Sequence, residues 1–227
     1  MWEAAARVKI NFKQAHAGNY AAGRSGPVEY IVIHYTSNQG DTAKNNADYF
    51  AREKVGASAH YFCDESEIWQ SVKDPDTAWH CGAKTYWHPD CRNANSIGVE
   101  ICMNDGQGNV RQGSIDRAAQ LVRLLMDKYH IAKENVLRHY DVTGKHCPGP
   151  MVDDPALWAA FQQSLTQTED DSVRYKYYDD MPDWAKPTVS KLVKKGYLKG
   201  EGGGVLNLTE DTLKVLVVND RAGCYGE

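Results

Sequence analysis

The chain has 227 residues, of which 42% are hydrophobic and 25% are charged, and its formal net charge is −4. This length and composition suit a globular protein with one full domain and a small second one. The negative charge balance does not favour a nucleic-acid partner, and no apolar run approaches the length that membrane insertion requires.

The first residues, MWEAAARVKINFKQ, lack the long apolar core of a signal peptide. We therefore expect synthesis in the cytoplasm, with any action outside the cell following release. Six cysteines occur without a CxxC pair, so a structural zinc ribbon is not expected. Cytoplasmic synthesis favours free thiols, although Cys81 and Cys91 flank a loop and a bridge between them under oxidising conditions stays open.

The first third of the chain predicts strands around one helix. Residues 28–37, VEYIVIHYTS, form an apolar, β-branched run that indicates a buried strand. A helix is expected over residues 41–53, with Asp41 or Thr42 as its N-cap. Residues 57–72 predict two strands joined by a turn.

The following residues continue this alternation. Residues 77–95 show no periodicity and are rich in Trp, His and Tyr, which is typical of a binding loop. Residues 95–104 predict a strand, and residues 114–131 predict the clearest helix, capped by Ser114. NVLRHYDV then predicts a short strand, and DDPALWAAFQQSL a closing helix. Alternating strands and helices indicate an α/β fold with a sheet covered by helices.

The last quarter of the chain predicts a separate small domain. Residues 166–180 lack apolar periodicity and are interpreted as a linker between a first domain at 1–165 and a helical C-terminal domain at 181–227. Thr209 is expected as a helix N-cap, and Gly196 and Gly223 lie where C-terminal caps are expected. About fifty residues give a thin core, so a partner surface is expected there.

Three residues offer ligands for a hydrolytic metal site. His34 and His139 are each expected at a strand end, and Cys147 follows eight residues after His139. A hydrolytic zinc site needs three protein ligands and one open position, and its positive charge lowers the pKa of bound water to about 7. Taken singly, each residue also suits an ordinary buried role. Cys147 as a nucleophile with a histidine base is a further hypothesis, but it leaves His34 unexplained.

Five segments occur in a recognisable order: YIVIHYTS, SAHYF, AWHCG, NSIGVEIC and RHYDVTGKHCPGP. Over about residues 8–165 the sequence resembles the zinc-dependent N-acetylmuramoyl-L-alanine amidases of the type-2 group, which share a fold with peptidoglycan recognition proteins. Within this group it resembles endolysins of phages that infect Clostridium-type bacteria. The resemblance implies a mixed central β-sheet flanked by helices. It also implies a bacteriolytic hydrolase that cleaves the amide between N-acetylmuramic acid and L-alanine in peptidoglycan.

The resemblance also implies roles for individual residues. It places Zn²⁺ on His34, His139 and Cys147. Glu100 would accept a proton from the attacking water and pass it to the leaving amine. Lys145 would face the developing oxyanion.

One position departs from the pattern of some relatives. Ala59 stands where they carry a catalytic tyrosine, so the role of base rests on Glu100, with Tyr35 or Tyr61 as remote substitutes. His60 and His80 are expected to contribute to substrate binding, His80 by lining the cleft. His60 is expected to act as a strand residue or a partner of the ligands rather than as a ligand itself.

A second class of function is a non-catalytic peptidoglycan-binding module on the same fold. Recognition proteins of that kind typically lack the ligand at the position of Cys147, so its presence with Glu100 and Lys145 favours catalysis. The C-terminal segment resembles the tail of Clostridium-type endolysins and, more distantly, an S-layer-homology unit, which implies attachment to the cell wall. The alternative for this segment is a helical pair that packs on the amidase domain or forms a homodimer.

Overall fold

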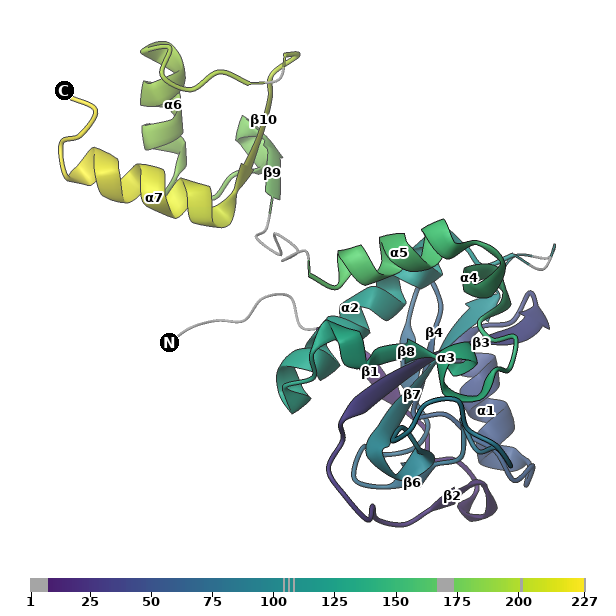
Figure 1. The fold of residues 1–227 in the computed structure, drawn as a ribbon. Coiled ribbons are helices and arrows are strands. Elements are labelled where there is room, and N and C mark those ends of the chain that lie inside the picture. Colours follow the sequence, from purple (N-terminus) through teal and green to yellow (C-terminus); the bar gives the residue numbers. More distant parts are fainter. Residues whose placement is uncertain are drawn as a thin grey trace. The chain divides into compact units, whose positions relative to one another are not determined.

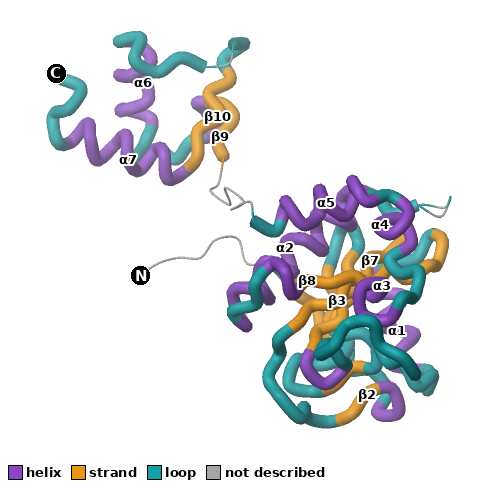
Figure 2. The backbone as a smooth tube through the Cα atoms, viewed as in Figure 1, coloured by secondary structure: helices purple, strands orange, loops and turns teal. Residues whose placement is uncertain are grey.

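The computed structural model describes residues 8–103, 105, 107, 109–166, 174–200 and 202–226. The chain divides into two compact units, of which one spans Val8–Gln167 and the other includes Thr168–Glu227 (Figures 1 and 2). Each unit has its own hydrophobic cluster.

A mixed sheet forms the centre of the first unit (Figure 1). Its neighbouring strands are parallel except for one antiparallel pair, β4 with β5. Among the described residues the sheet has six strands, in the order β1 (Ile10–Phe12), β5 (Ile68–Gln70), β4 (Tyr61–Cys63), β7 (Ser96–Met103), β3 (Tyr30–Gln39) and β8 (Val136–Arg138). A short antiparallel pair lies apart from it, β2 (Tyr20–Ala21) with β6 (Thr77–Ala78). The predicted mixed sheet flanked by helices is confirmed.

Helices cover both faces of this sheet (Figure 1). Helix α2 (Gln112–Tyr129) and helix α5 (Pro155–Ser164) bury their apolar sides against Ile31 and Ile33 of β3. Helix α1 (Ala43–Arg52) packs on the opposite face, where Phe62 is buried. Because side chains alternate along a strand, odd-numbered residues of β3 stabilise the α2 side and even-numbered residues face away from it.

The helix ends explain where the sequence predictions succeed and fail. Thr42 caps α1, its hydroxyl accepting a hydrogen bond from the backbone N–H of Asn45 at 3.1 Å. The prediction that Ser114 caps the next helix is wrong. The carbonyl of Arg111 already accepts from the N–H of Ser114 at 3.0 Å, so α2 begins two residues before Ser114, which is buried in its first turn. The predicted closing helix is present as α5, and the carboxylate of Asp154 caps its start.

Two short helices complete the first unit, α3 (His139–Thr143) and α4 (Gly149–Asp153). One-turn 3₁₀ helices occur at η1 (Ala17–Asn19), η2 (Asn93–Asn95) and η3 (Lys133–Asn135). Within the described residues, every helix is too short or too polar to cross a bilayer.

The second unit contains strands as well as helices. Strand β9 (Arg174–Tyr177) pairs antiparallel with β10 (Val205–Thr209), beside α6 (Lys186–Lys194) and α7 (Glu210–Arg221). The interpretation of residues 166–180 as a linker is therefore wrong for 174–180, where β9 and η4 (Tyr178–Asp180) form; residues 167–173 lie outside the described residues. The unit is also not purely helical.

Strands β9 and β10 form because their residues alternate between the two faces of the strand pair. This alternation places Tyr175, Leu206 and Leu208 against the cluster around Leu213. The expected caps do occur. The Thr209 hydroxyl accepts from the N–H of Thr212, and Gly196 and Gly223 follow the two helices with φ of +72° and +78°.

Candidate metal centre and active site

His34 and Glu100 lie side by side on the two central strands. In the parallel register of β3 and β7, His34 pairs with Glu100 and Val32 pairs with Gly98. Paired residues of neighbouring strands project from the same face of a sheet. Because Ile33 is buried under α2, both His34 and Glu100 project from the opposite face.

His139 and Cys147 reach the same face from the next segment. Ile33 pairs with Arg138, the last residue of β8, so His139 follows directly beside His34. His139 is the first residue of α3 and not a strand residue as predicted, because Arg138 already has the extended backbone of an N-cap. The chain then turns back, and the N–H of Tyr140 donates to the carbonyl of Cys147 at 2.8 Å.

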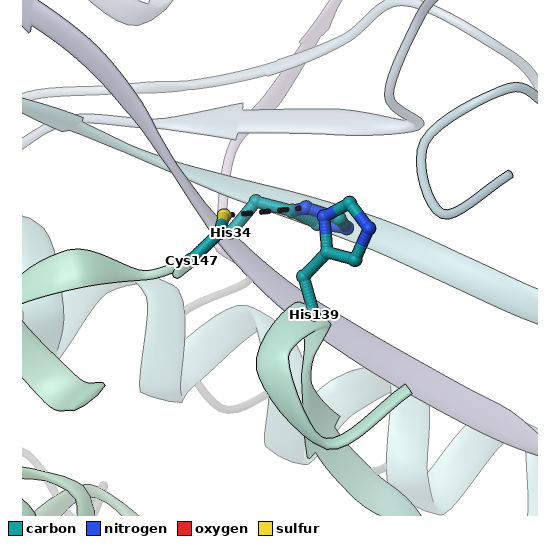
Figure 3. A group of neighbouring side chains, drawn as sticks. All are labelled: His34, His139 and Cys147. Atoms are coloured by element: carbon teal, nitrogen blue, oxygen red, sulfur yellow. Dashed lines mark hydrogen bonds between the residues drawn. The ribbon is translucent and has the colours of Figure 1, made fainter. Parts of the chain in front are cut away.

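These three side chains form a compact cluster (Figure 3). One nitrogen of His34, one nitrogen of His139 and the sulfur of Cys147 all lie within 4.8 Å of one another. The Sγ of Cys147 is 3.7 Å from Nδ1 of His34, and the centroids of the two imidazole rings are 4.7 Å apart. A tetrahedral metal with ordinary Zn–S and Zn–N bond lengths would separate sulfur and nitrogen ligands by about 3.6 Å.

A further observation fits a metal at this cluster. Nδ1 of His139 is buried and has no hydrogen-bond partner in the part of the chain that the structure describes. A buried polar atom without a partner is rare in folded proteins. A cation bound by the cluster would satisfy this nitrogen, so the residues present fit a three-ligand metal site.

The environment sets the protonation of the three ligands. Burial, followed by the neighbouring imidazoles of His80 and His139, lowers the pKa of His34 well below its ordinary value. Burial and the charge of Lys145 lower the pKa of His139 to about 4. Burial, followed by the charge of Glu100, raises the pKa of the Cys147 thiol to about 12. At neutral pH both imidazoles therefore have free lone pairs, while the thiol keeps its proton until a cation displaces it.

Glu100 and Lys145 accompany the cluster. Oε2 of Glu100 is buried and, among the described residues, has no hydrogen-bond partner. Burial raises the pKa of Glu100 to about 8, against the opposing charge of Lys145. Lys145 is exposed, and its ammonium group has no hydrogen-bond or ion-pair partner among the described residues. A carboxyl group of this kind can accept and release a proton near neutral pH, with a free cation close by.

An open cleft of about 620 Å³ leads to this site, within the usual range for small ligand sites. Three segments of the first unit line it: residues 56–57, residues 79–93 and residues 139–145. The aromatic, amide and cationic groups among them are Trp79, His80, Asn93, His139 and Lys145. The loop at 77–95 therefore borders the cleft, which agrees with its interpretation as a binding loop.

The structure places the two histidines that were predicted to bind substrate in different environments. His80 lines the cleft, and its Nδ1 lies 3.0 Å from Nε2 of His34. His60 is fully buried, and its Nδ1 accepts from the N–H of Gly98 at 3.0 Å. This complete burial shields His60 from the cleft, so the expectation that it contacts substrate does not agree with its position here.

The two tyrosines named as remote substitutes also face away from Glu100. The hydroxyl of Tyr61 donates to the buried carboxylate of Asp74 at 2.6 Å, on the α2 side of the sheet. Tyr35 follows His34 on β3 and borders a small cavity with Met151 on that same side. Ala59 is buried. Glu100 is therefore the carboxyl group that remains beside the cluster for the role of base.

Arg138 was not singled out from the sequence, although it organises the segment that carries two of the ligands. Its guanidinium donates to both oxygens of Asp141, at 2.8 and 3.1 Å, and to the carbonyl of Met151 at 2.9 Å. It also lies over the rings of Tyr140 and Trp158. Arg138 thus holds the start and the end of residues 138–151 together. The spacing of Arg138 and Asp141 at three residues was the available signal.

Residues 24–150 match the model of the family described as N-acetylmuramoyl-L-alanine amidase (Amidase_2). The chain belongs to this amidase family. Its curated relatives include the amidase CwlL of Bacillus licheniformis, 33% identical over 168 residues, which covers 70% of this chain and 45% of the relative. The amidase BlyA of Bacillus subtilis is 31% identical over 153 residues, covering 61% of this chain and 41% of the relative. The chain thus spans about half the length of the curated amidases that it matches.

Solved amidase-family structures agree with the fold. The structure of PlyL matches with a TM-score of 0.61 at 29% identity, covering 70% of this chain and 98% of that one. The catalytic domain of XlyA matches with a TM-score of 0.57 at 29% identity, covering 70% and 99%. Nearly all of each solved domain is matched by about two thirds of this amidase-family chain.

Proposed function

We propose that this chain is a zinc-dependent peptidoglycan hydrolase that cleaves the amide between the lactyl group of N-acetylmuramic acid and L-alanine. The observation that carries the proposal is the buried cluster of His34, His139 and Cys147 next to Glu100. Two imidazoles and one thiolate are typical zinc ligands, and three protein ligands leave the fourth position open. The membership of the chain in the amidase family and the amidase names of its relatives support this substrate.

Zn²⁺ at this cluster would supply a Lewis acid that lowers the pKa of water and polarises the scissile carbonyl. The residues of the chain then have separate tasks. Glu100 takes a proton from the attacking water and returns it to the leaving amine. Burial raises its pKa, a bound cation would lower it again, and a pKa near neutrality suits both transfers. Lys145, whose ammonium group has no ion-pair partner among the described residues, stabilises the negative charge that develops on the carbonyl oxygen.

The structure disfavours the thiol-nucleophile hypothesis. The Cys147 side chain is 4% exposed, so a substrate carbonyl cannot approach its sulfur in this arrangement. Burial also raises the pKa of the Cys147 thiol to about 12, which keeps it in the weakly nucleophilic protonated form. A buried carboxylate oxygen without a partner, as in Glu100, is costly to the fold. A catalytic role accounts for this cost, whereas a non-catalytic binding module does not require it.

The first prediction tests the function directly. The purified protein should release L-alanine-terminated stem peptides from bacterial cell walls, lose this activity on thorough chelation, and regain it with added Zn²⁺. Metal analysis should find about one zinc per chain. Glu100→Gln should keep the zinc and lose at least about 100-fold in turnover, while the exposed Glu134→Gln serves as the matched control.

The possible outcomes separate the alternatives. Activity that survives complete metal removal excludes the zinc proposal. Binding to walls without release of peptides indicates the non-catalytic module. Cys147→Ser should weaken zinc binding itself, because an alcohol is a poor zinc ligand.

We also propose that the protein acts at the cell wall and that the second unit holds it there. A groove of about 510 Å³ along α6 is lined by Asp183 and by the lysines at 186, 191, 194 and 195. Lys186 and Lys191 form ion pairs with Asp183 and Asp220, and the excess of positive charge suits the anionic groups of a cell wall. The alternative role is a homodimer through the C-terminal helices. Val215 and Val218 are 58% and 63% exposed three residues apart on α7, so they form one apolar patch that a second copy can cover.

A further inference from the structure

His80 connects the ligand His34 to a buried serine. Nδ1 of His80 lies 3.0 Å from Nε2 of His34, and Nε2 of His80 lies 3.2 Å from Oγ of Ser96. The rings of His34 and His80 are nearly perpendicular, with centroids 5.1 Å apart. Each nitrogen of His80 therefore faces a different polar partner.

The direction of these hydrogen bonds follows from the serine. The Ser96 hydroxyl has one proton, and it donates this proton to the carbonyl of Arg92 at 2.6 Å, because a carbonyl oxygen can only accept. Ser96 is fully buried, so no solvent competes for the proton. The nearby Cys81 sulfur, 3.9 Å from the Ser96 oxygen, donates instead to the side-chain oxygen of Asn93. Toward His80, Ser96 must act as the acceptor.

The protons of both imidazoles are thereby assigned. His80 donates from Nε2 to Ser96, so in the neutral ring its Nδ1 has a lone pair and accepts. His34 must then carry its proton on Nε2, which faces that lone pair, and its Nδ1 is left unprotonated. This Nδ1 is the atom that lies 3.7 Å from the Cys147 sulfur.

We propose that His80, oriented by Ser96, is a positioning residue that fixes the tautomer and the ring orientation of His34 so that its Nδ1 is presented to the metal. The inference rests on the metal site of the proposed function. Gly98 supports it, because a Cβ there would lie 2.5 Å from Cγ of His80, and only glycine lets the ring lie this close to β7. The backbone N–H of His80 is also held, by the side-chain oxygen of Asn93 at 3.1 Å.

Two substitutions of similar size separate a positioning role from a merely structural one. His80→Asn keeps an acceptor oxygen where Nδ1 stood, whereas His80→Leu removes it. Zinc affinity, measured by competition with a chromophoric chelator, should fall roughly 10- to 100-fold in His80→Leu and should be largely restored in His80→Asn. Ser96→Ala should lower the affinity by a smaller factor. His130→Asn is the control, because His130 is exposed and its left-handed backbone, with φ of +54°, suits asparagine.

The metal-free protein provides a second readout that does not depend on zinc. Long-range ¹H–¹⁵N correlation spectra should show His34 protonated at Nε2 in the wild type, with a slowly exchanging proton that is lost in His80→Leu and kept in His80→Asn. Equal zinc affinity in the wild type and His80→Leu, or an affinity in His80→Asn as low as in His80→Leu, overturns the proposal. A His34 protonated at Nδ1 also overturns it. If the wild type binds no zinc while the spectra agree, the proposed function fails and the assigned tautomer stands.

Discussion

Burial puts the groups of the metal cluster into different protonation states before any cation arrives. His34 and His139 have pKa values below neutrality, whereas Cys147 and Glu100 have raised pKa values of about 12 and about 8. At pH 7 the imidazoles are thus neutral, the thiol is protonated and the carboxyl group is mostly protonated. A cation lowers the pKa of both acidic groups.

Zinc binding to the metal-free protein should therefore release protons. At pH 7 the wild type should release between about one and two protons, of which one comes from Cys147 and the remainder from Glu100. Zinc affinity should rise with pH, because release of protons is favoured when they are scarce. Glu100→Gln should release only about one proton and show the shallower pH dependence.

Calorimetric titrations in buffers of different ionisation enthalpy give the number of protons released when zinc binds. Equal proton release by the wild type and Glu100→Gln would show that the carboxyl group of Glu100 does not change its protonation when zinc binds. Release of no protons by either protein would mean that the Cys147 thiol is not the ligand.

Lys145 provides a second prediction at the scale of one residue. Lys145→Met should lower kcat by about 100-fold, because the substitution removes a positive charge that faces the transition state. The free energy of unfolding should stay within about 0.5 kcal/mol of the wild type, as for other exposed residues. Lys145→Arg should restore part of kcat, and Lys133→Met is the control at a site away from the cleft. Undiminished turnover in Lys145→Met would remove Lys145 from the mechanism.

At the scale of elements, the cleft depends on how α3 and α4 are held together. Arg138→Met should lower the free energy of unfolding by about 1–3 kcal/mol, because it leaves the carboxylate of Asp141 and the carbonyl of Met151 without their charged donor. Zinc affinity should fall as well, since residues 138–151 carry two ligands. Denaturant unfolding of the metal-free protein and zinc competition measure the two effects.

Arg52→Met, which removes an exposed arginine paired with Glu53, is the matched control and should change the unfolding free energy by no more than about 0.5 kcal/mol. If Arg138→Met lowers stability without changing zinc affinity, the guanidinium does not position the ligands.

The same scale shows what the sequence can and cannot predict. The central strands β3 and β7 were predictable, because long β-branched runs with buried residues on both faces are distinctive. Strand β1 was missed, since three residues at a sheet edge form a strand only through their pairing with the distant β5. Strand β9, RYKY, was missed because its charged residues conceal the inward-facing Tyr175.

The sequence likewise indicates some features of the candidate site and not others. The resemblance indicated the residues that the sheet brings together, His34, Glu100, His139 and Cys147, and their convergence follows from strand order and register. The hydrogen bond from His34 to His80 and the complete burial of His60 could not be predicted. Both depend on side-chain rotamers, and the position of the His80 ring depends also on the missing side chain of Gly98.

The two compact units of the chain indicate where a truncation can separate them. Truncation after Thr166 removes the second unit including β9, whereas truncation at Met181 would leave β9 without its partner β10. The chain truncated after Thr166 should keep turnover on a small soluble substrate, because every residue of the proposed active site lies in Val8–Gln167. It should bind purified cell walls more weakly, as a pull-down assay measures.

Sedimentation velocity on the same two proteins tests the alternative role of the second unit. If the full chain is a dimer and the truncated chain a monomer, while wall binding is unchanged, the second unit serves dimerisation and not attachment. Unchanged wall binding together with the same oligomeric state in both proteins would contradict both roles.

The ligands of the cluster are far apart along the chain, with a sequence separation of 113 between His34 and Cys147. Synthesis proceeds from the N-terminus, so a ribosome delivers His34 long before the other two ligands, and His139 and Cys147 arrive almost together. The complete set exists only after nearly the whole first unit has emerged and β3, β7 and β8 have paired. A chain that ends before Cys147 therefore has no assembled site, and the proposed activity requires that the first unit be synthesised through this residue and folded.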